Sequence, residues 1–261
     1  VFIENDEKNQ KETVVVPTND YVFKRIFGHV GNEGITIDLL NSILSDNVKT
    51  INLDENPILE KDLKDDKLGI LDIKATLNNE IYTDIEMQVA EKADMVKRIL
   101  FYWAKLYSKG INAGDGYIEL NKTICILIAN YELEEIKELT DYHTEWKIIE
   151  NKYRKTVLTP VFELHIISLP KLNLVKGKLE EKERKLLKWC QFLVNPYNVD
   201  VEGYDRIMEA KNEIEKIRKD KRERWLAEQR QKYIWDMKAT ADPLRIQCSA
   251  YCLWCFVCLW L

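Results

Sequence analysis

The chain of 261 residues carries 39 Lys and Arg against 44 Asp and Glu, a net charge of −5, and 46% of its residues are hydrophobic. This composition supports a sizeable core and excludes a wholly disordered chain and a protein that coats nucleic acid by bulk positive charge, while a local basic groove stays open. The sequence has no run of about 20 apolar residues, so no stable membrane insertion is expected.

The first part of the chain predicts a loose segment followed by two helices. Residues 1–16 are largely polar and are expected to be loose. A short helix then ends at Gly28, and its cap comes from Thr18, Asn19 or Asp20. A second helix fits residues 33–45, before a charged connection over residues 54–67.

A hairpin and a helix follow. Residues 69–77 and 81–89 read as two strands, and the turn-forming sequence Asn-Asn-Glu lies between them. Apolar residues at steps of three and four predict a helix over residues 91–109.

The second half predicts two strands and two helices. Residues 123–131 and 161–169 read as buried strands, and residues 179–194 as an amphipathic helix. Residues 201–238 predict one long charged helix. The order of elements indicates an α/β fold with a mixed sheet flanked by helices and a helical C-terminal extension.

The hairpin concentrates polar side chains on one face. Asp72 and Lys74 are two residues apart on the first strand, and Asp84, Glu86 and Gln88 alternate on the second. The opposite faces are apolar. Two interpretations are open: a polar face that meets only solvent, or a functional site.

The functional interpretation is a metal site. Asp72 and Glu86 on adjacent strands can place two carboxylates around Mg²⁺, which prefers oxygen ligands and can activate a bound water. The backbone carbonyl of Met87 can complete the metal shell, and Lys74 or Gln88 can orient the water or contact a phosphate.

An ordered series of segments resembles the PD-(D/E)XK nuclease-fold transposases, the group that includes the Rpn-type recombination-promoting nucleases. The segments are TNDYVFKRIFG, GILDIKA, IYTDIEMQ, KRILFYWAKLYSKGI, GDGYIELNKTICILI and ELHIISLPKL. The resemblance runs from about residue 17 to residue 195 and implies a restriction-endonuclease-like nuclease domain over residues 17–200.

The resemblance assigns the catalytic positions. Asp72 matches the strand aspartate and Glu86 the second acidic ligand of that family. Gln88 stands where the general family pattern has Lys. Glutamine at this position is usual for this subgroup, but it supplies no charge. Lys74 or Lys24 could restore that charge.

Three further residues are implied as substrate-binding or supporting groups. Asp20 matches an acidic position on the first helix, and its other interpretation is a helix cap. Arg98 and Tyr102 lie four apart on the helix after the hairpin, which the resemblance places beside the metal site. Arg98 could then meet a phosphate; its other interpretation is a surface arginine.

The implied function is a Mg²⁺-dependent DNA endonuclease of mobile elements or recombination, with Mn²⁺ as an alternative metal. Its partner would be double-stranded DNA, held by a local groove and the basic stretch of residues 216–224. Homodimer formation is a further option. The alternative function is a catalytically decayed transposase, or a helical interaction protein without enzymatic activity.

The cysteines are unevenly distributed along the chain. Four of six cysteines crowd into the last 14 residues, which does not fit a secreted disulfide scaffold, so a cytoplasmic location is expected. Residues 239–261 break in composition from the rest and are expected to dock poorly, as an altered end of the chain. His29, His143 and His165 are scattered, form no metal-ligand spacing and predict structural or surface roles.

Overall fold

The computed structural model of the chain describes residues 15–54, 73–91 and 94–238. The predictions for Asp72, for the N-terminal segment up to residue 14 and for residues 239–261 concern residues outside this described part.

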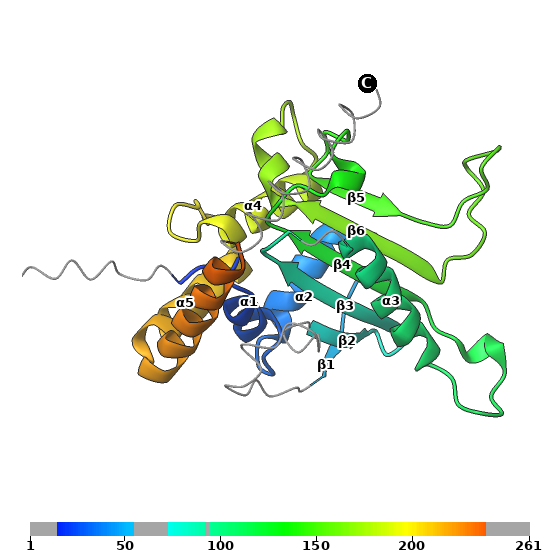
Figure 1. Ribbon diagram of the computed structural model, residues 1–261, viewed down its shortest axis with the longest axis horizontal. Helices are drawn as coiled ribbons and strands as arrows, with labels where there is room; N and C mark the ends of the chain where they lie inside the picture. Colours follow the sequence, from blue (N-terminus) through cyan, green and yellow to red (C-terminus); the bar gives the residue numbers. More distant parts are fainter. Residues whose placement is uncertain (1–14, 55–72, 92–93, 239–261) are drawn as a thin grey trace, which may run out of the picture.

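The described residues form an α/β fold built on a six-stranded mixed sheet (Figure 1). The order across the sheet is β1-β2-β3-β4-β6-β5; β3, β4 and β6 are parallel, and the remaining pairs are antiparallel. The strands are β1 Ile51–Leu53, β2 Ile73–Leu77, β3 Ile81–Gln88, β4 Thr123–Ala129, β5 His143–Trp146 and β6 Phe162–Ser168. The predicted fold class is confirmed.

Helices cover both faces of this sheet. The helices are α1 Asp20–Phe27, α2 Glu33–Ile43, α3 Met95–Ser108, α4 Glu181–Val194 and α5 Asp205–Lys219, with residues 221–238 forming a further helix. Short 3-10 turns lie at Tyr117–Glu119, Glu134–Ile136 and Leu169–Leu174. In the described part of the chain, no helix has both the length and the apolar character that crossing a membrane requires.

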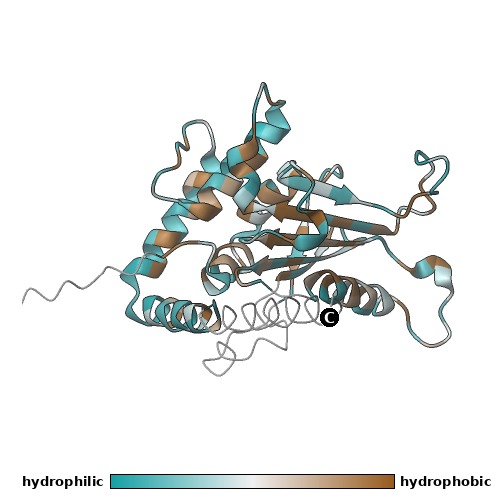
Figure 2. Ribbon diagram, turned by 45° about the horizontal axis from the view of Figure 1, so that its top comes forward, coloured by the Kyte–Doolittle hydropathy of each residue, from teal (hydrophilic) through white to brown (hydrophobic). Residues whose placement is uncertain are grey.

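The sheet separates two apolar clusters because its inner strands bury both faces (Figure 2). The larger cluster joins one face, including Ile85 and Ile126, to the helices α1, α2, α4 and α5. The smaller cluster joins Cys125 and Leu127 of β4 to Met95 and other residues of α3. Every residue of β4 is buried, as is typical of a strand covered on both sides.

The β2–β3 hairpin turns where the sequence predicts it. Asn78 and Asn79 have φ values of 50° and 61°. Two successive positive φ values are the geometry of the tight hairpin turn that favours Asn and Gly. The Asn78 side chain also accepts hydrogen bonds from the backbone of Lys49 and Thr50, so the turn fixes the approach to β1.

Two strands and one helix break differ from the sequence prediction. The edge strands β1 and β5 were not expected; they are short and have mixed polar composition, which hides the strand pattern. The long helix expected over residues 201–238 is two helices, with Asp220 in an extended conformation between them. The Asp220 side chain accepts hydrogen bonds from the backbone of Arg222 and Glu223 and so caps the second helix.

Candidate functional site: a buried acidic strand beside helix α3

The candidate site lies on β3, on the face of the sheet that α3 covers. Ile85 and Met87 point into the larger cluster, so strand alternation turns Glu86 toward α3. The Glu86 residue is only 4% exposed. The polar face of the hairpin is therefore buried beneath a helix, and the interpretation of a face that meets only solvent does not hold for Glu86.

Arg98 of α3 contacts this buried carboxylate. Its Nη2 atom lies 3.4 Å from Glu86 Oε1, and the Arg98 side chain is 17% exposed. The guanidinium carbon also lies 5.2 Å from the ring centre of Tyr102, one helical turn further on. The helix after the hairpin thus brings its arginine beside Glu86 and its tyrosine against that arginine, and a partly exposed cation borders the site.

Gln88 ends the strand on the same face as Glu86. It is 8% exposed, and its Nε2 donates a 3.2 Å hydrogen bond to the backbone carbonyl of Ala90. The side chain of Met87 lies in the core, so only its backbone carbonyl could serve as a ligand. Both residues follow Glu86 at the end of β3.

Lys74 and Asp84 face each other across the hairpin. The register pairs them directly, which places Lys74 on the face of Glu86 and Gln88. Lys74 is half-buried, whereas Asp84 is 4% exposed. Asp84 is a buried carboxylate that the sequence interpretation left out of the site, although its alternation with Glu86 was the signal that could have included it.

Asp20 lies in a structural ion pair. Arg230 of the helix over residues 221–238 donates from Nε to both Asp20 oxygens, at 2.8 and 3.1 Å, and from Nη2 as well. The cap of α1 is Asn19, which accepts from the backbone of Tyr21 and Val22. Arg230 was missed from the sequence because 210 residues separate it from Asp20.

Lys24 lies close to the start of β2. It is 6% exposed and sits on α1 near Gly28. A Cβ atom added to Gly28 would lie 3.3 Å from Lys24 Cγ and 3.2 Å from Ile73 Cγ1, so these groups pack tightly. Ile73 directly follows Asp72 in the sequence, while Asp72 itself lies outside the described residues.

The basic stretch of residues 216–224 has acidic neighbours. Lys216 pairs with Glu213 and Arg218 with Glu215, while Arg224 lies 3.8 Å from Glu228. These acids lower the local positive potential, so the stretch is a weaker candidate for holding DNA than its lysine and arginine content suggests.

Two of the histidines expected to be scattered meet in the fold. The antiparallel pairing of β5 with β6 brings His143 Nε2 within 2.9 Å of His165 Nδ1. Burial and the neighbouring His165 lower the pKa of His143 to about 4. Burial raises the pKa of Glu163, but hydrogen bonds from His165 and Lys122 outweigh it and lower that pKa to about 2. The unexpected strand β5 creates this contact.

A divalent cation fits the chemistry of the β3 site. Glu86 supplies a buried carboxylate and Met87 a backbone carbonyl, and oxygen ligands are those that Mg²⁺ prefers. The Arg98 guanidinium already offsets part of the Glu86 charge, so a cation at this carboxylate would compete with Arg98.

The α/β fold, a mixed sheet flanked by helices, is consistent with a restriction-endonuclease-like fold. A family model described as PD-(D/E)XK nuclease family transposase matches residues 17–243. The chain belongs to this family, and its role is related to nuclease or transposase activity. The comparisons found no matching curated protein and no matching solved structure.

Proposed function

We propose that the chain is a metal-dependent DNA endonuclease that hydrolyses phosphodiester bonds in mobile elements or recombination. The observation that carries the proposal is the Glu86 carboxylate, buried at the end of a central strand and contacted by Arg98, in a chain of a nuclease family. A charged group buried in this way costs free energy and is typical of a functional site.

The metal would be held by Asp72, Glu86 and the carbonyl of Met87. Mg²⁺, or Mn²⁺ in its place, supplies an activated water and offsets charge on the phosphate when it is bound. These three groups offer only oxygen ligands, which is the donor set both metals take in proteins.

The remaining residues would position water and substrate. Gln88 lies on the face of Glu86, and its amide can donate to or accept from a water, but it brings no charge. Lys74, on the neighbouring strand of the same face, can supply the positive charge that the family pattern places at this point. Lys24 is the second candidate for that charge, because its stem packs near the start of β2.

Arg98 would bind a phosphate of double-stranded DNA. Its guanidinium is partly exposed, so it can make charge-assisted hydrogen bonds to a phosphate while it remains near Glu86. Tyr102 would hold the guanidinium through its ring face. Asp20 would act at a distance from the metal, by fixing α1 through Arg230.

The test is nicking of supercoiled plasmid with Mg²⁺, with Mn²⁺ and with EDTA. The variant Glu86→Gln keeps the size of the side chain and removes its charge, and Asp72→Ala removes the second proposed ligand. Both should lower the nicking rate by at least about 100-fold. The matched control is Glu80→Gln, an exposed acid in the turn of the same hairpin, which should nick at the unaltered rate.

Two outcomes would overturn the proposal. One is a folded, unaltered protein that nicks no DNA with either metal, which would support the alternative of a decayed transposase. The other is a Glu86→Gln variant that nicks at the unaltered rate.

A further inference from the structure

A second group of metal-binding side chains lies on the other face of the sheet. Glu145, Glu163 and His165 each offer a ligand atom within 4.8 Å of the others. Glu145 and His165 are direct cross-strand partners, and Glu163 lies two residues before His165 on β6, so all three share one face. Sheet pairing alone brings these donors together.

This face is opposite to the one that carries Glu86. His165 lies level with Ile126 of β4, which points into the larger cluster, whereas Glu86 lies level with Leu127, which points into the α3 cluster. The group is therefore separate from the proposed nuclease site and does not depend on it.

The two buried members are held in place by further hydrogen bonds. His165 Nε2 and Glu163 Oε1 form a 2.8 Å hydrogen bond, which a metal ion would replace with a bond to each atom. The other ring nitrogen of His165 contacts His143 at 2.9 Å, and the other oxygen of Glu163 contacts Lys122 at 2.8 Å. Supporting partners of this kind fix the orientation of metal ligands in proteins.

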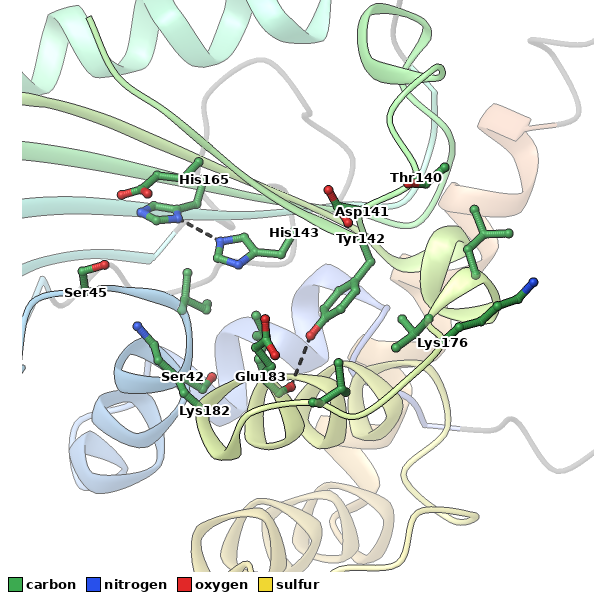
Figure 3. Close-up of a pocket in the computed structure, with 16 residues that line it drawn as sticks. Ser42, Ser45, Thr140, Asp141, Tyr142, His143, His165, Lys176, Lys182 and Glu183 are labelled. Carbon is green, nitrogen blue, oxygen red and sulfur yellow. Dashed lines mark hydrogen bonds between the residues drawn. The ribbon is translucent and has the colours of Figure 1, made fainter. Parts of the chain in front are cut away.

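A pocket gives access to the group. His143, Glu145 and His165 line a cavity of about 600 Å³ between the β5–β6 pair and the helices α2 and α4. Figure 3 shows the hydrogen-bonded histidines on one side of this pocket and Glu183 of α4 on the other. Three protein ligands would leave coordination positions that water or a small ligand can fill from the pocket.

The local charge favours a cation. Asp46, Glu145 and Glu163 contribute three carboxylates, and Lys122 and Lys147, which contact them, contribute two ammonium groups. The other charged residues that line the pocket cancel in charge; they are Asp141, Glu183, Lys176 and Lys182. The balance of these groups is −1 when both histidines are neutral. A divalent cation would meet attraction from the carboxylates, although Lys122 offsets part of it.

We infer that Glu145, Glu163 and His165 form a second metal site, which takes a transition-metal ion such as Zn²⁺, Co²⁺ or Mn²⁺. One imidazole and two carboxylates suit these ions better than Mg²⁺, which prefers oxygen ligands alone. Without metal, His165 donates its Nε2 proton to Glu163. In that state His165 Nδ1 accepts from His143 Nε2. On metal binding at His165 Nε2, the His165 proton would move to Nδ1 and be donated to His143 Nε2, while the His143 proton would move from Nε2 to its own Nδ1, so neither histidine releases a proton.

The test is a titration with Co²⁺ followed by visible absorption and by metal analysis. The full chain is used with its four C-terminal cysteines replaced (C248S, C252S, C255S, C258S), because cysteine thiolates also bind Co²⁺. With excess Mg²⁺ present to fill the proposed nuclease site, one equivalent of Co²⁺ should bind without thiolate charge-transfer absorption.

Glu145→Gln is the deciding variant. Glu145 is exposed, so the substitution should not disturb the fold, which circular dichroism checks. Co²⁺ affinity should fall by at least about tenfold. The control is Glu135→Gln, an exposed acid elsewhere, which should bind Co²⁺ as before. Glu86→Gln, measured in the same excess of Mg²⁺, should also bind Co²⁺ as before. It distinguishes this group from the proposed nuclease site, because only the Co²⁺ that Mg²⁺ cannot displace is compared.

Three results would overturn the inference. They are the absence of bound Co²⁺, unaltered affinity in Glu145→Gln, and binding that is lost in Glu86→Gln but kept in Glu145→Gln. The last result would assign the metal to the β3 site instead.

Discussion

Arg230 donates hydrogen bonds to both carboxylate oxygens of Asp20, which precedes it by 210 residues. The two residues are 3% and 7% exposed, so the pair is removed from water. Tyr21 and Arg25 of α1 also bond to Glu223 of the same C-terminal helix. The first and last described helices are therefore joined by charged and polar groups.

Removal of one partner of the Asp20–Arg230 pair should destabilise the folded protein. Arg230→Ala leaves the Asp20 charge buried, and the free energy of unfolding should fall by about 3–5 kcal/mol. Urea unfolding measures this change. The exposed pair Arg206–Glu209 is the control, and Arg206→Ala should cost less than about 1 kcal/mol. Equal stability of Arg230→Ala and the unaltered protein would contradict a structural role for the pair.

Substitution of Arg98 should lower both the Mg²⁺ concentration needed for nicking and the maximal nicking rate, for different reasons. In Arg98→Gln, a cation that competes with the metal for Glu86 is gone, so half-maximal nicking should need less Mg²⁺. The maximal rate should fall by about 100-fold, because the proposed phosphate contact is lost. Lys97→Gln, an exposed neighbour on α3, is the control. A higher Mg²⁺ requirement in Arg98→Gln would mean that Arg98 supports metal binding.

Tyr21 should make the protein sensitive to alkali. Burial, the Glu223 charge and the hydrogen bond to Glu223 raise the pKa of Tyr21 above its usual value near 10. Above about pH 10 the phenol ionises in the unfolded chain but stays protonated in the folded one, so stability falls as the pH rises. Tyr21→Phe should show a smaller fall between pH 9 and pH 11, measured by urea unfolding. A fall as steep as that of the unaltered protein would remove Tyr21 as its cause.

Two thiols should be protected in the native protein. Cys125 and Cys190 are 1% and 0% exposed, and burial raises the pKa of the Cys190 thiol, so little thiolate is available. Iodoacetamide should label both only after urea is added, as peptide mass spectrometry can show. Labelling of Cys190 in the native protein at the rate of a small thiol would show that α4 opens readily.

The hairpin was predictable because its signals are local. Alternation placed Glu86 and Gln88 on one face, and the Asn-Asn turn fixed the register of β2 with β3. To predict that Glu86 is buried and contacted by Arg98, the position of α3 was also required. The resemblance implied that position, and the structure shows it. The roles of these residues in catalysis stay a proposal.

The histidine contact and the Asp20 ion pair were not predictable from local pattern. His143 and His165 are 22 residues apart, and they meet only because the unexpected strand β5 pairs with β6. An aspartate at the start of a helix suits a cap as well as an ion pair, and only its distant partner Arg230 separates the two interpretations. Both cases depend on contacts between segments that no local rule joins.

The ion pair between Asp20 of α1 and Arg230 of the helix over residues 221–238 also has a consequence for synthesis on the ribosome. Elongation at about 5–20 residues per second separates the emergence of Asp20 from that of Arg230 by roughly 10–40 seconds. Throughout that interval α1 lacks the arginine that neutralises its buried aspartate. The ion pair that fixes α1 can therefore form only after nearly the whole described chain has been synthesised.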